Sequence, residues 1–332
     1  MSDVGAKSAP RPKQAAVKGR VAVVYHPEKI DLRRTKRAVE KHTKTLGYSP
    51  ALWFATTEED KGGGQARDAV AQGASVIMVA GGDGTLREVI QAVYDQDVSI
   101  SLLPLGTGNI LARNLSLPLN AMAQSVDRAI NGEDRQLDLG RVTMHLEDGT
   151  INEQIFVGLA GVGLDATIIL NTDSALKRRI GWFAYVDAGF RSLPIQFERL
   201  QLTVDNRETR TLKVHMLLIG NCGFLPGNIS VMPEAKLDDG ILDVAAVGPR
   251  RIWNWVDLWG RITLGNWLVR PVPGGRRMMD GTANVKTLEN LNGKRIELKP
   301  ERAVDIQLDG DAFGRVKLAV FEVLPGAMRF RS

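Results

Sequence analysis

The sequence predicts an α/β fold in which an N-terminal parallel-sheet, nucleotide-binding domain is joined to a second domain built mainly on antiparallel sheet. In the first third of the chain, short apolar segments alternate with helical ones, and two of the apolar segments run directly into glycine-rich turns. Beyond residue 135 the pattern changes to longer β-rich stretches separated by Asp, Asn and Gly. At 332 residues the chain exceeds what one hydrophobic core organises, so we expect two domains.

The N-terminal part of the chain reads as four strands with helices between them. We expect strands at 21–25, 51–54, 75–80 and 99–103, and helices that end near 46, run from about 64 to 72, and cover 86–93 and 120–130. Alternation of this kind implies right-handed crossovers and a parallel sheet covered by helices. In the second half, the β-rich stretches at 154–159, 211–218 and 304–308 predict antiparallel strands.

The most informative motif is Gly81-Gly82-Asp83-Gly84-Thr85, between the strand at 75–80 and the helical segment at 86–93. Glycine allows phosphate to approach the backbone N–H groups closely, and the helix dipole adds positive charge at that point. Asp83 would repel phosphate unless a cation lies between them, so it suggests a divalent metal on a nucleotide. For the pentapeptide alone, a tight turn after any core strand is the alternative.

A second turn, Gly106-Thr107-Gly108-Asn109, follows the strand at 99–103 and again precedes a helix start. The carboxyl ends of neighbouring parallel strands border one ligand crevice, so the two turns should share a site. Neither turn is a Walker A loop, because no Gly-Lys-Ser/Thr follows.

Charge and composition exclude several classes of protein. The first 20 residues carry a net charge of +4 out of +5 for the whole chain, so the rest is nearly neutral and we expect no nucleic-acid partner. We interpret residues 1–19 as a disordered basic arm, without the apolar core of a secretory signal. No apolar run reaches the roughly 18 residues of a membrane span. The single cysteine, Cys222, excludes an intrachain disulfide.

Six motifs occur in a specific order along the chain. They are GGDGT at 81–85, LPLGTGN at 103–109, DLG at 138–140, GVGLDA at 161–166, PEAKLDDG at 233–240 and LDG at 308–310. Together they resemble the diacylglycerol kinase catalytic-domain family over residues 20 to 330. Within it, the closest likeness is to soluble bacterial diacylglycerol and YegS-like lipid kinases, with sphingosine and ceramide kinases as relatives. GGDGT alone would also fit NAD kinases, but LGTGN with KLDDG and the late DG does not.

This resemblance implies a β-sandwich-like second domain whose final strand, around 323–331, returns to the first domain. The domains would then be 20–134 plus 324–332, which binds the nucleotide, and 135–323, which binds a lipid. It also implies ATP and Mg²⁺ as cofactors. The residues expected at the nucleotide are Gly81, Gly82, Asp83, Gly84, Thr85, Glu88, Gly106, Thr107, Asn109, Asp311 and Thr56 or its neighbour Thr57.

Three aspartates are the candidates for catalysis. Asp83 would reach Mg²⁺ directly or through water. Asp309 matches the aspartate that the family is thought to use as general base, although an Asp-Gly hairpin turn explains the local sequence equally well. Asp138 matches a family aspartate thought to join the acidic network around Mg²⁺ or to meet the lipid head group; without the resemblance it reads as a solvent residue at a strand end.

The KLDDG motif resembles a second, structural Mg²⁺ loop. Asp239 would supply a carboxylate, and neighbouring carbonyls, at Lys236 and Ile241, would complete the oxygen ligands. A plain Asp-Gly turn before the strand that begins at 241 is the alternative.

Three departures from the family pattern bear on activity. His26 stands where the first strand is commonly followed by asparagine, Arg87 where asparagine is frequent, and Asp311 where glutamate is expected. These departures keep open a nucleotide- or lipid-binding regulator without transfer activity, and NAD kinase is a further, disfavoured alternative.

Two segments mix cationic and aromatic residues, as a membrane-interface helix does: 177–185 and 250–267, the second with four of the six tryptophans. Packing of the indoles inside the second domain is the alternative. We expect a cytoplasmic lipid kinase of phospholipid metabolism, peripherally associated with the membrane where its lipid substrate lies. Exposed strand edges in the second domain would allow a homodimer.

Overall fold

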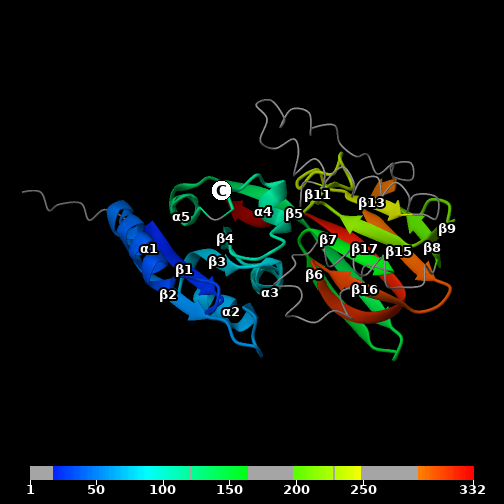
Figure 1. Ribbon diagram of the computed structural model, residues 1–332, viewed down its shortest axis with the longest axis horizontal. Helices are drawn as coiled ribbons and strands as arrows, with labels where there is room; N and C mark the ends of the chain where they lie inside the picture. The colour runs from blue at the N-terminus through cyan, green and yellow to red at the C-terminus, as the bar shows by residue number, and fades with distance from the viewer. Residues whose placement is uncertain (1–17, 120, 164–196, 227–228, 248–290) are drawn as a thin grey trace, which may run out of the picture.

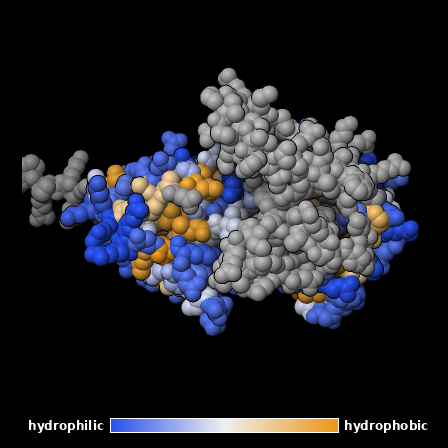
Figure 2. Space-filling model, in the orientation of Figure 1, coloured by the Kyte–Doolittle hydropathy of each residue, from blue (hydrophilic) through white to orange (hydrophobic). Residues whose placement is uncertain are grey.

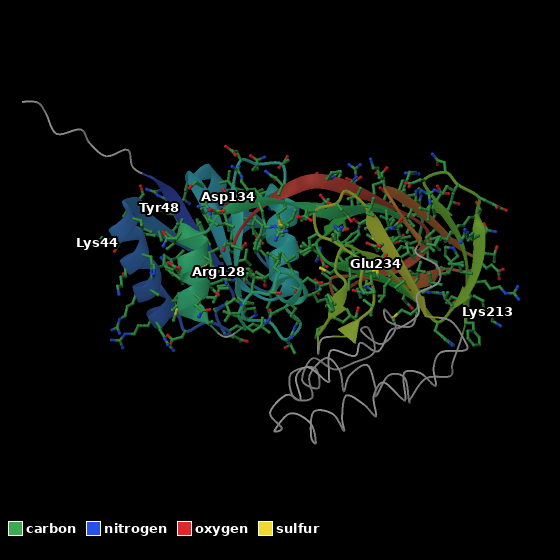
Figure 3. The ribbon with its side chains drawn as sticks, turned by 90° about the horizontal axis from the view of Figure 1, so that it is seen from above. Lys44, Tyr48, Arg128, Asp134, Lys213 and Glu234 are labelled. Atoms are coloured by element: carbon green, nitrogen blue, oxygen red, sulfur yellow. The ribbon has the colours of Figure 1, made fainter. Side chains whose placement is uncertain are left out.

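The computed structural model describes residues 18–119, 121–163, 197–226, 229–247 and 291–332. They form two regions that follow one another along the long axis of the molecule (Figure 1). Figure 3 places Lys44, Tyr48, Arg128 and Asp134 in the parallel-sheet region, and Lys213 and Glu234 in the β-rich region. This arrangement confirms the predicted fold class. The cationic and aromatic segments singled out at 177–185 and 250–267 lie outside the described residues.

The parallel-sheet region alternates strands and helices as predicted. Its strands are β1 (Lys18–Tyr25), β2 (Tyr48–Ala55), β3 (Ala74–Gly81) and β4 (Ser99–Pro104), parallel in the order β4-β3-β1-β2. Its helices are α1 (Leu32–Leu46), α2 (Gly63–Ala71), α3 (Asp83–Val93), α4 (Ile110–Asn114) and α5 (Met122–Asn131). β1 begins at Lys18, inside the predicted basic arm, and the short helix α4 follows the second glycine turn, where a helix start was predicted.

Helices bury both faces of this sheet, which explains the uninterrupted apolar run in β3. Successive side chains of a strand point to opposite faces. Ile77 therefore packs in the core that contains Leu86 of α3, whereas Met78 packs with Val39 of α1 and Val126 of α5. A strand that is buried on both faces needs no polar alternation.

Helix α1 shows how local sequence sets an element's ends. The Asp31 carboxylate accepts a hydrogen bond from the Arg34 N–H at 3.0 Å, which caps the first turn, and Gly47 ends the helix with a φ of 75°. The exposed positions of α1 include Arg33 and Arg37, and many hydrophilic residues lie at this end of the molecule, next to hydrophobic ones (Figure 2).

The second region is almost entirely antiparallel. Its strands are β5 (Asp134–Leu146), β6 (Ile151–Phe156), β7 (Leu159–Gly163), β8 (Glu198–Val204), β9 (Arg210–Val214), β10 (Met216–Gly220), β11 (Phe224–Leu225), β12 (Ile229–Ser230), β13 (Leu242–Val247), β14 (Leu291–Gly293), β15 (Arg295–Pro300), β16 (Val304–Leu308) and β17 (Asp311–Arg331). Phe156 and Phe321 anchor the core, with their ring centroids 6.2 Å apart in an edge-to-face arrangement.

The last strand, β17, connects the two regions. It pairs with β5 in antiparallel register from Val316 to Arg331, and near its end Phe330 pairs in parallel with Ile100 of β4 (Figure 1). The pairing shifts between Leu324 and Met328, where Gly326 has a φ of 59°. The boundary that we predicted between residues 323 and 324 therefore lies inside a continuous strand, and the division into domains stays an interpretation.

Two stretches predicted as single β-rich segments are each broken. In 154–159, β6 ends at Phe156 and β7 begins at Leu159, because the backbone between them turns its N–H groups toward the Asp309 carboxylate. In 211–218, the chain bends at His215, so that β9 pairs with β8 while β10 pairs with β7 and β13. Within the described residues, no helix is long and apolar enough to cross a membrane.

Candidate active site

The two glycine turns lie against one another at the carboxyl edge of the parallel sheet. Gly81 of β3 pairs with Pro104 of β4, which brings the residues after both strands together. A Cβ atom on Gly106 would lie 2.6 Å from the Gly82 Cα, and one on Gly82 would lie 3.2 Å from the Gly106 Cα. Glycine is required at Gly106 because backbone approaches backbone there.

A cavity of about 560 Å³ opens at this edge. Its lining comes from the ends of β1 and β2, the first turn of α3, the turn after β4, and the turn between β16 and β17. The lining residues are His26, Pro27, Glu28, Lys29, Thr56, Thr57, Glu58, Lys61, Gly82, Asp83, Gly84, Thr85, Gly106, Thr107, Asp309, Gly310 and Asp311. Both regions of the molecule therefore contribute to one site.

The start of α3 presents unpaired backbone donors to this cavity. Gly82 occupies the N-cap position without a side chain to cap the helix, and Gly84 and Thr85 follow in the first turn. The first N–H groups of a helix have no partner within the helix, and its dipole favours negative charge there. The arrangement suits a phosphate group.

Asp83 lies in the same turn and is held by the second glycine loop. Its Oδ1 accepts a hydrogen bond from the Ile110 N–H at 2.7 Å. Burial, and then the neighbouring Asp309 carboxylate, raise the pKa of Asp83 to about 6. A carboxylate that is destabilised in this way favours a nearby cation.

Asp309 is buried and bonded to three consecutive backbone amides. Its Oδ2 accepts from the Val157 N–H at 2.7 Å, and its Oδ1 accepts from Gly158 at 2.8 Å and Leu159 at 3.0 Å. Burial raises the pKa of Asp309, while these amides and Arg87 oppose the shift. An ionised carboxylate has about four acceptor positions, so Oδ2 retains one for a further donor. The residue has a φ of 48°, which an aspartate tolerates.

Asp311 reaches the cavity from the start of β17 and is paired with a buried arginine. Its Oδ2 lies 3.0 Å from Arg87 Nη2, and the same nitrogen lies 2.7 Å from Glu88 Oε1. Glu88, which we expected at the nucleotide, is not among the cavity-lining residues and instead contacts Arg87.

Gly81 and Asn109 also lie behind the lining. The Asn109 side chain accepts from the Gly106 N–H at 3.0 Å and donates to the Gly106 carbonyl at 2.7 Å. Asn109 therefore shapes the second glycine turn, and its predicted contact with the nucleotide stays a prediction.

Asp138 does not line this cavity. Its Oδ2 accepts from the Gly240 N–H at 2.6 Å and its Oδ1 from the Gly326 N–H at 2.7 Å. These bonds tie the KLDDG loop and the irregular part of β17 to the beginning of β5. The described contacts of the Asp138 carboxylate are structural, and the catalytic role expected of Asp138 stays a prediction.

The KLDDG loop, with Lys236, Asp239 and Ile241, also lies outside the cavity lining. The Ile241 N–H donates to Asp239 Oδ1 at 3.4 Å, and burial raises the pKa of Asp239. Among the described residues, no three His, Cys, Asp or Glu side chains converge as a ready-made metal site. Ligation by one carboxylate and backbone carbonyls stays a prediction.

Sequence reasoning missed four charged residues of the cavity: Glu28, Lys29, Glu58 and Lys61. They follow β1 and β2 in the sequence. Residues at the carboxyl ends of parallel strands border the ligand crevice, and this position could have identified them. Thr56 and Thr57 were identified on that ground, and His26 was noted as a departure; burial lowers the pKa of His26.

Two family models match the chain. "Diacylglycerol kinase catalytic domain" matches residues 20–142, and "YegS C-terminal NAD kinase beta sandwich-like domain" matches residues 158–331. A protein of Pseudomonas aeruginosa named "Probable lipid kinase YegS-like" is 29% identical over 321 residues, which are 94% of each chain. Its namesake in Pseudomonas fluorescens is 32% identical over 79% of each chain.

A "Diacylglycerol kinase" of Staphylococcus saprophyticus is 29% identical over 69% of this chain and 72% of its own length. Among solved structures, a diacylglycerol kinase from Bacillus anthracis superposes with a TM-score of 0.70 at 20% identity, covering 94% of this chain and 96% of its own. At that identity the structural likeness concerns the fold alone.

Proposed function

Because the chain belongs to the diacylglycerol kinase and YegS-like lipid kinase family, we propose that it uses ATP and Mg²⁺ to phosphorylate a hydroxyl of diacylglycerol or a related lipid. One observation carries the proposal. The phosphate-binding start of α3 and the Asp309 carboxylate, which retains an acceptor position, line the same cavity.

The first turn of α3 would hold the phosphates of ATP. Gly82 and Gly84 line the cavity at the start of the helix, and Gly106 and Thr107 line it from the second glycine turn. Lys29 and Lys61 lie at the exposed rim of the cavity, where they would attract the nucleotide.

The charge of the lining fits a requirement for Mg²⁺. Five carboxylates and two lysines line the cavity, which would repel a triphosphate without further cations. Asp83, which lies in the first turn of α3, would hold the ion together with phosphate oxygens and water, the ligands that Mg²⁺ usually keeps. When bound, Mg²⁺ neutralises the charge that the phosphates carry during transfer.

Asp309 would act as the general base. Its free position on Oδ2 would accept the proton of the lipid hydroxyl. The hydroxyl oxygen would form the new bond to the γ-phosphorus while the bond from that phosphorus to the bridging oxygen of ADP breaks. The three amides keep the carboxylate from rotating, so the proton acceptor is oriented before the lipid binds.

The test is transfer of ³²P from γ-labelled ATP to mixed micelles that contain diacylglycerol, monoacylglycerol, ceramide or sphingosine. Wild type is compared with Asp83→Ala and Asp309→Asn, and NAD is offered as an alternative acceptor. A labelled lipid formed by wild type and lost in both variants supports the proposal and identifies the lipid class. Intact ATP binding without labelled product favours a regulator, and labelled NADP favours NAD kinase.

Sedimentation with anionic vesicles tests the site of action. We propose peripheral association with the cytoplasmic membrane surface, strengthened by the basic residues at 1–19 and weakened by salt. Binding that 0.5 M salt leaves unchanged would argue against an electrostatic contribution.

A further inference from the structure

Arg87 is a buried cation directly behind the cavity. It follows the glycine turn on α3, and the residue is 2% exposed. Arginine is almost never fully buried unless it is paired, because removing its charge from water is costly. Its surroundings should therefore explain its presence.

The guanidinium group contacts both regions of the molecule. Nη2 lies 2.7 Å from Glu88 Oε1 on its own helix and 3.0 Å from Asp311 Oδ2 on β17. Nη1 lies 3.4 Å from Gln154 Oε1 on β6, and the group's central carbon lies 4.8 Å from the centre of the Phe313 ring. Arg87 thus joins the helix that begins with the phosphate-binding turn to two strands of the β-rich region.

Asp311, one of the two partners, lies against the phosphate-binding turn. A Cβ on Gly84 would be 3.0 Å from Asp311 Oδ2. A carboxylate at this point would compete with a phosphate for the first turn of α3 and would repel it. The two lysines of the lining are exposed, whereas the Arg87 side chain is only 3% exposed and is held against Asp311, whose side chain is 36% exposed.

We propose that Arg87 is a positioning residue that fixes and neutralises Asp311, so that the first turn of α3 accepts the nucleotide's phosphates. The role rests on the proposed function, because it assumes that ATP occupies this cavity. Arg87 does not itself line the cavity. It acts through Asp311, and the interaction therefore concerns nucleotide affinity more than lipid affinity.

Calorimetric titration with ATP and Mg²⁺ tests this role on the full chain. We expect Arg87→Gln to raise the dissociation constant of ATP about tenfold, a change of about 1.4 kcal/mol. Adding Asp311→Asn to that variant should restore most of the loss, because the unpaired carboxylate is then gone. In the lipid assay, the KM for ATP should follow the same pattern while the KM for lipid stays constant.

Two further variants separate charge from structure. Arg87→Lys keeps a cation beside Asp311, so its ATP dissociation constant should stay within about threefold of wild type; this comparison carries the test should Arg87→Gln fail to fold. Arg141→Gln is the matched control. Arg141 Nη2 lies 2.8 Å from Glu322 Oε2 outside the cavity, and its loss should leave ATP affinity unchanged.

The outcomes separate this inference from the proposed function. Unchanged ATP affinity in Arg87→Gln, an equal loss in Arg87→Lys, or no recovery in the double variant would overturn the role of Arg87. Wild type that binds ATP but labels no lipid counts against the proposed function only, since the calorimetric comparison still decides the inference. Wild type that binds no ATP contradicts both.

Discussion

Asp309 and Asp138 are both buried aspartates whose carboxylates accept hydrogen bonds from backbone N–H groups, but only Asp309 lines the cavity. Asp309 takes three amides and faces the cavity with one acceptor position left. Asp138 takes the amides of Gly240 and Gly326 and lies outside the cavity lining. Hydrogen bonding to the backbone orients the carboxylate in both places, and because only Asp309 lines the cavity, we propose a catalytic role for Asp309 and a structural one for Asp138.

The largest expected effect tests the Asp309 half of this comparison. Asp309→Asn should lower kcat for lipid phosphorylation by roughly 10²–10⁴-fold, the usual contribution of a general base, because the amide cannot accept a proton. ATP affinity measured by calorimetry should remain within a few-fold. A variant that keeps more than a tenth of the wild-type kcat would show that the proton leaves by another route.

The corresponding change at Asp138 should appear as lost stability. Asp138→Ala leaves the N–H groups of Gly240 and Gly326 without their partner, and because both hydrogen bonds are only partly buried, each loss should cost about 1–2 kcal/mol. Urea unfolding should show a free energy of unfolding lower by roughly 2–4 kcal/mol. A large fall in kcat with unchanged stability would instead support the catalytic role that the sequence predicted for Asp138.

Ionising the Asp83 carboxylate carries an electrostatic cost. The pKa of Asp83 is raised to about 6 in the folded protein. Ionisation of Asp83 therefore destabilises the fold fully above pH 6, and this penalty disappears as the pH falls toward the pKa of the unfolded chain. In EDTA at pH 7.5, Asp83→Asn should therefore be more stable than wild type, by up to about 3 kcal/mol, since one pKa unit corresponds to about 1.4 kcal/mol.

Thermal or urea unfolding across pH 4 to 8 measures this difference. It should shrink as the pH falls from 7 to 4, because wild-type Asp83 then becomes neutral as well. The substitution keeps the acceptor for the Ile110 N–H, so a difference that does not change with pH would contradict an electrostatic origin.

The smallest effects come from the glycines beside the two aspartates. Gly310 and Gly240 have φ values of 91° and 75°, which an L-residue adopts at a cost of about 1–2 kcal/mol. Gly310→Ala and Gly240→Ala should therefore lower the free energy of unfolding by similar amounts. Only Gly310→Ala should also lower kcat, because Gly310 lines the cavity next to Asp309. Equal losses of kcat in both variants would remove the distinction between the two sites.

Local sequence was sufficient for the alternating elements of the first region and for the two glycine turns. Apolar runs such as 75–80 are typical of a sheet that is covered on both faces, and a glycine turn between a strand and a helix predicts a phosphate-binding edge. Asp83, Thr56 and Thr107 were found in this way, because they follow strands whose carboxyl ends meet. Asp309 came from a motif, and the cavity places it beside these residues.

Tertiary structure alone decided which side chains meet across long stretches of chain. The break in 154–159 depends on a carboxylate about 150 residues away, Asp309, and the burial of Arg87 depends on Asp311 at a separation of 224 residues. Motifs could not show that Glu88 contacts Arg87 instead of the cavity, or that Asp138 joins the KLDDG loop to the irregular part of β17. Composition and spacing determine local conformation and chemical type, whereas the partner of a buried charge is set by the packing of distant strands.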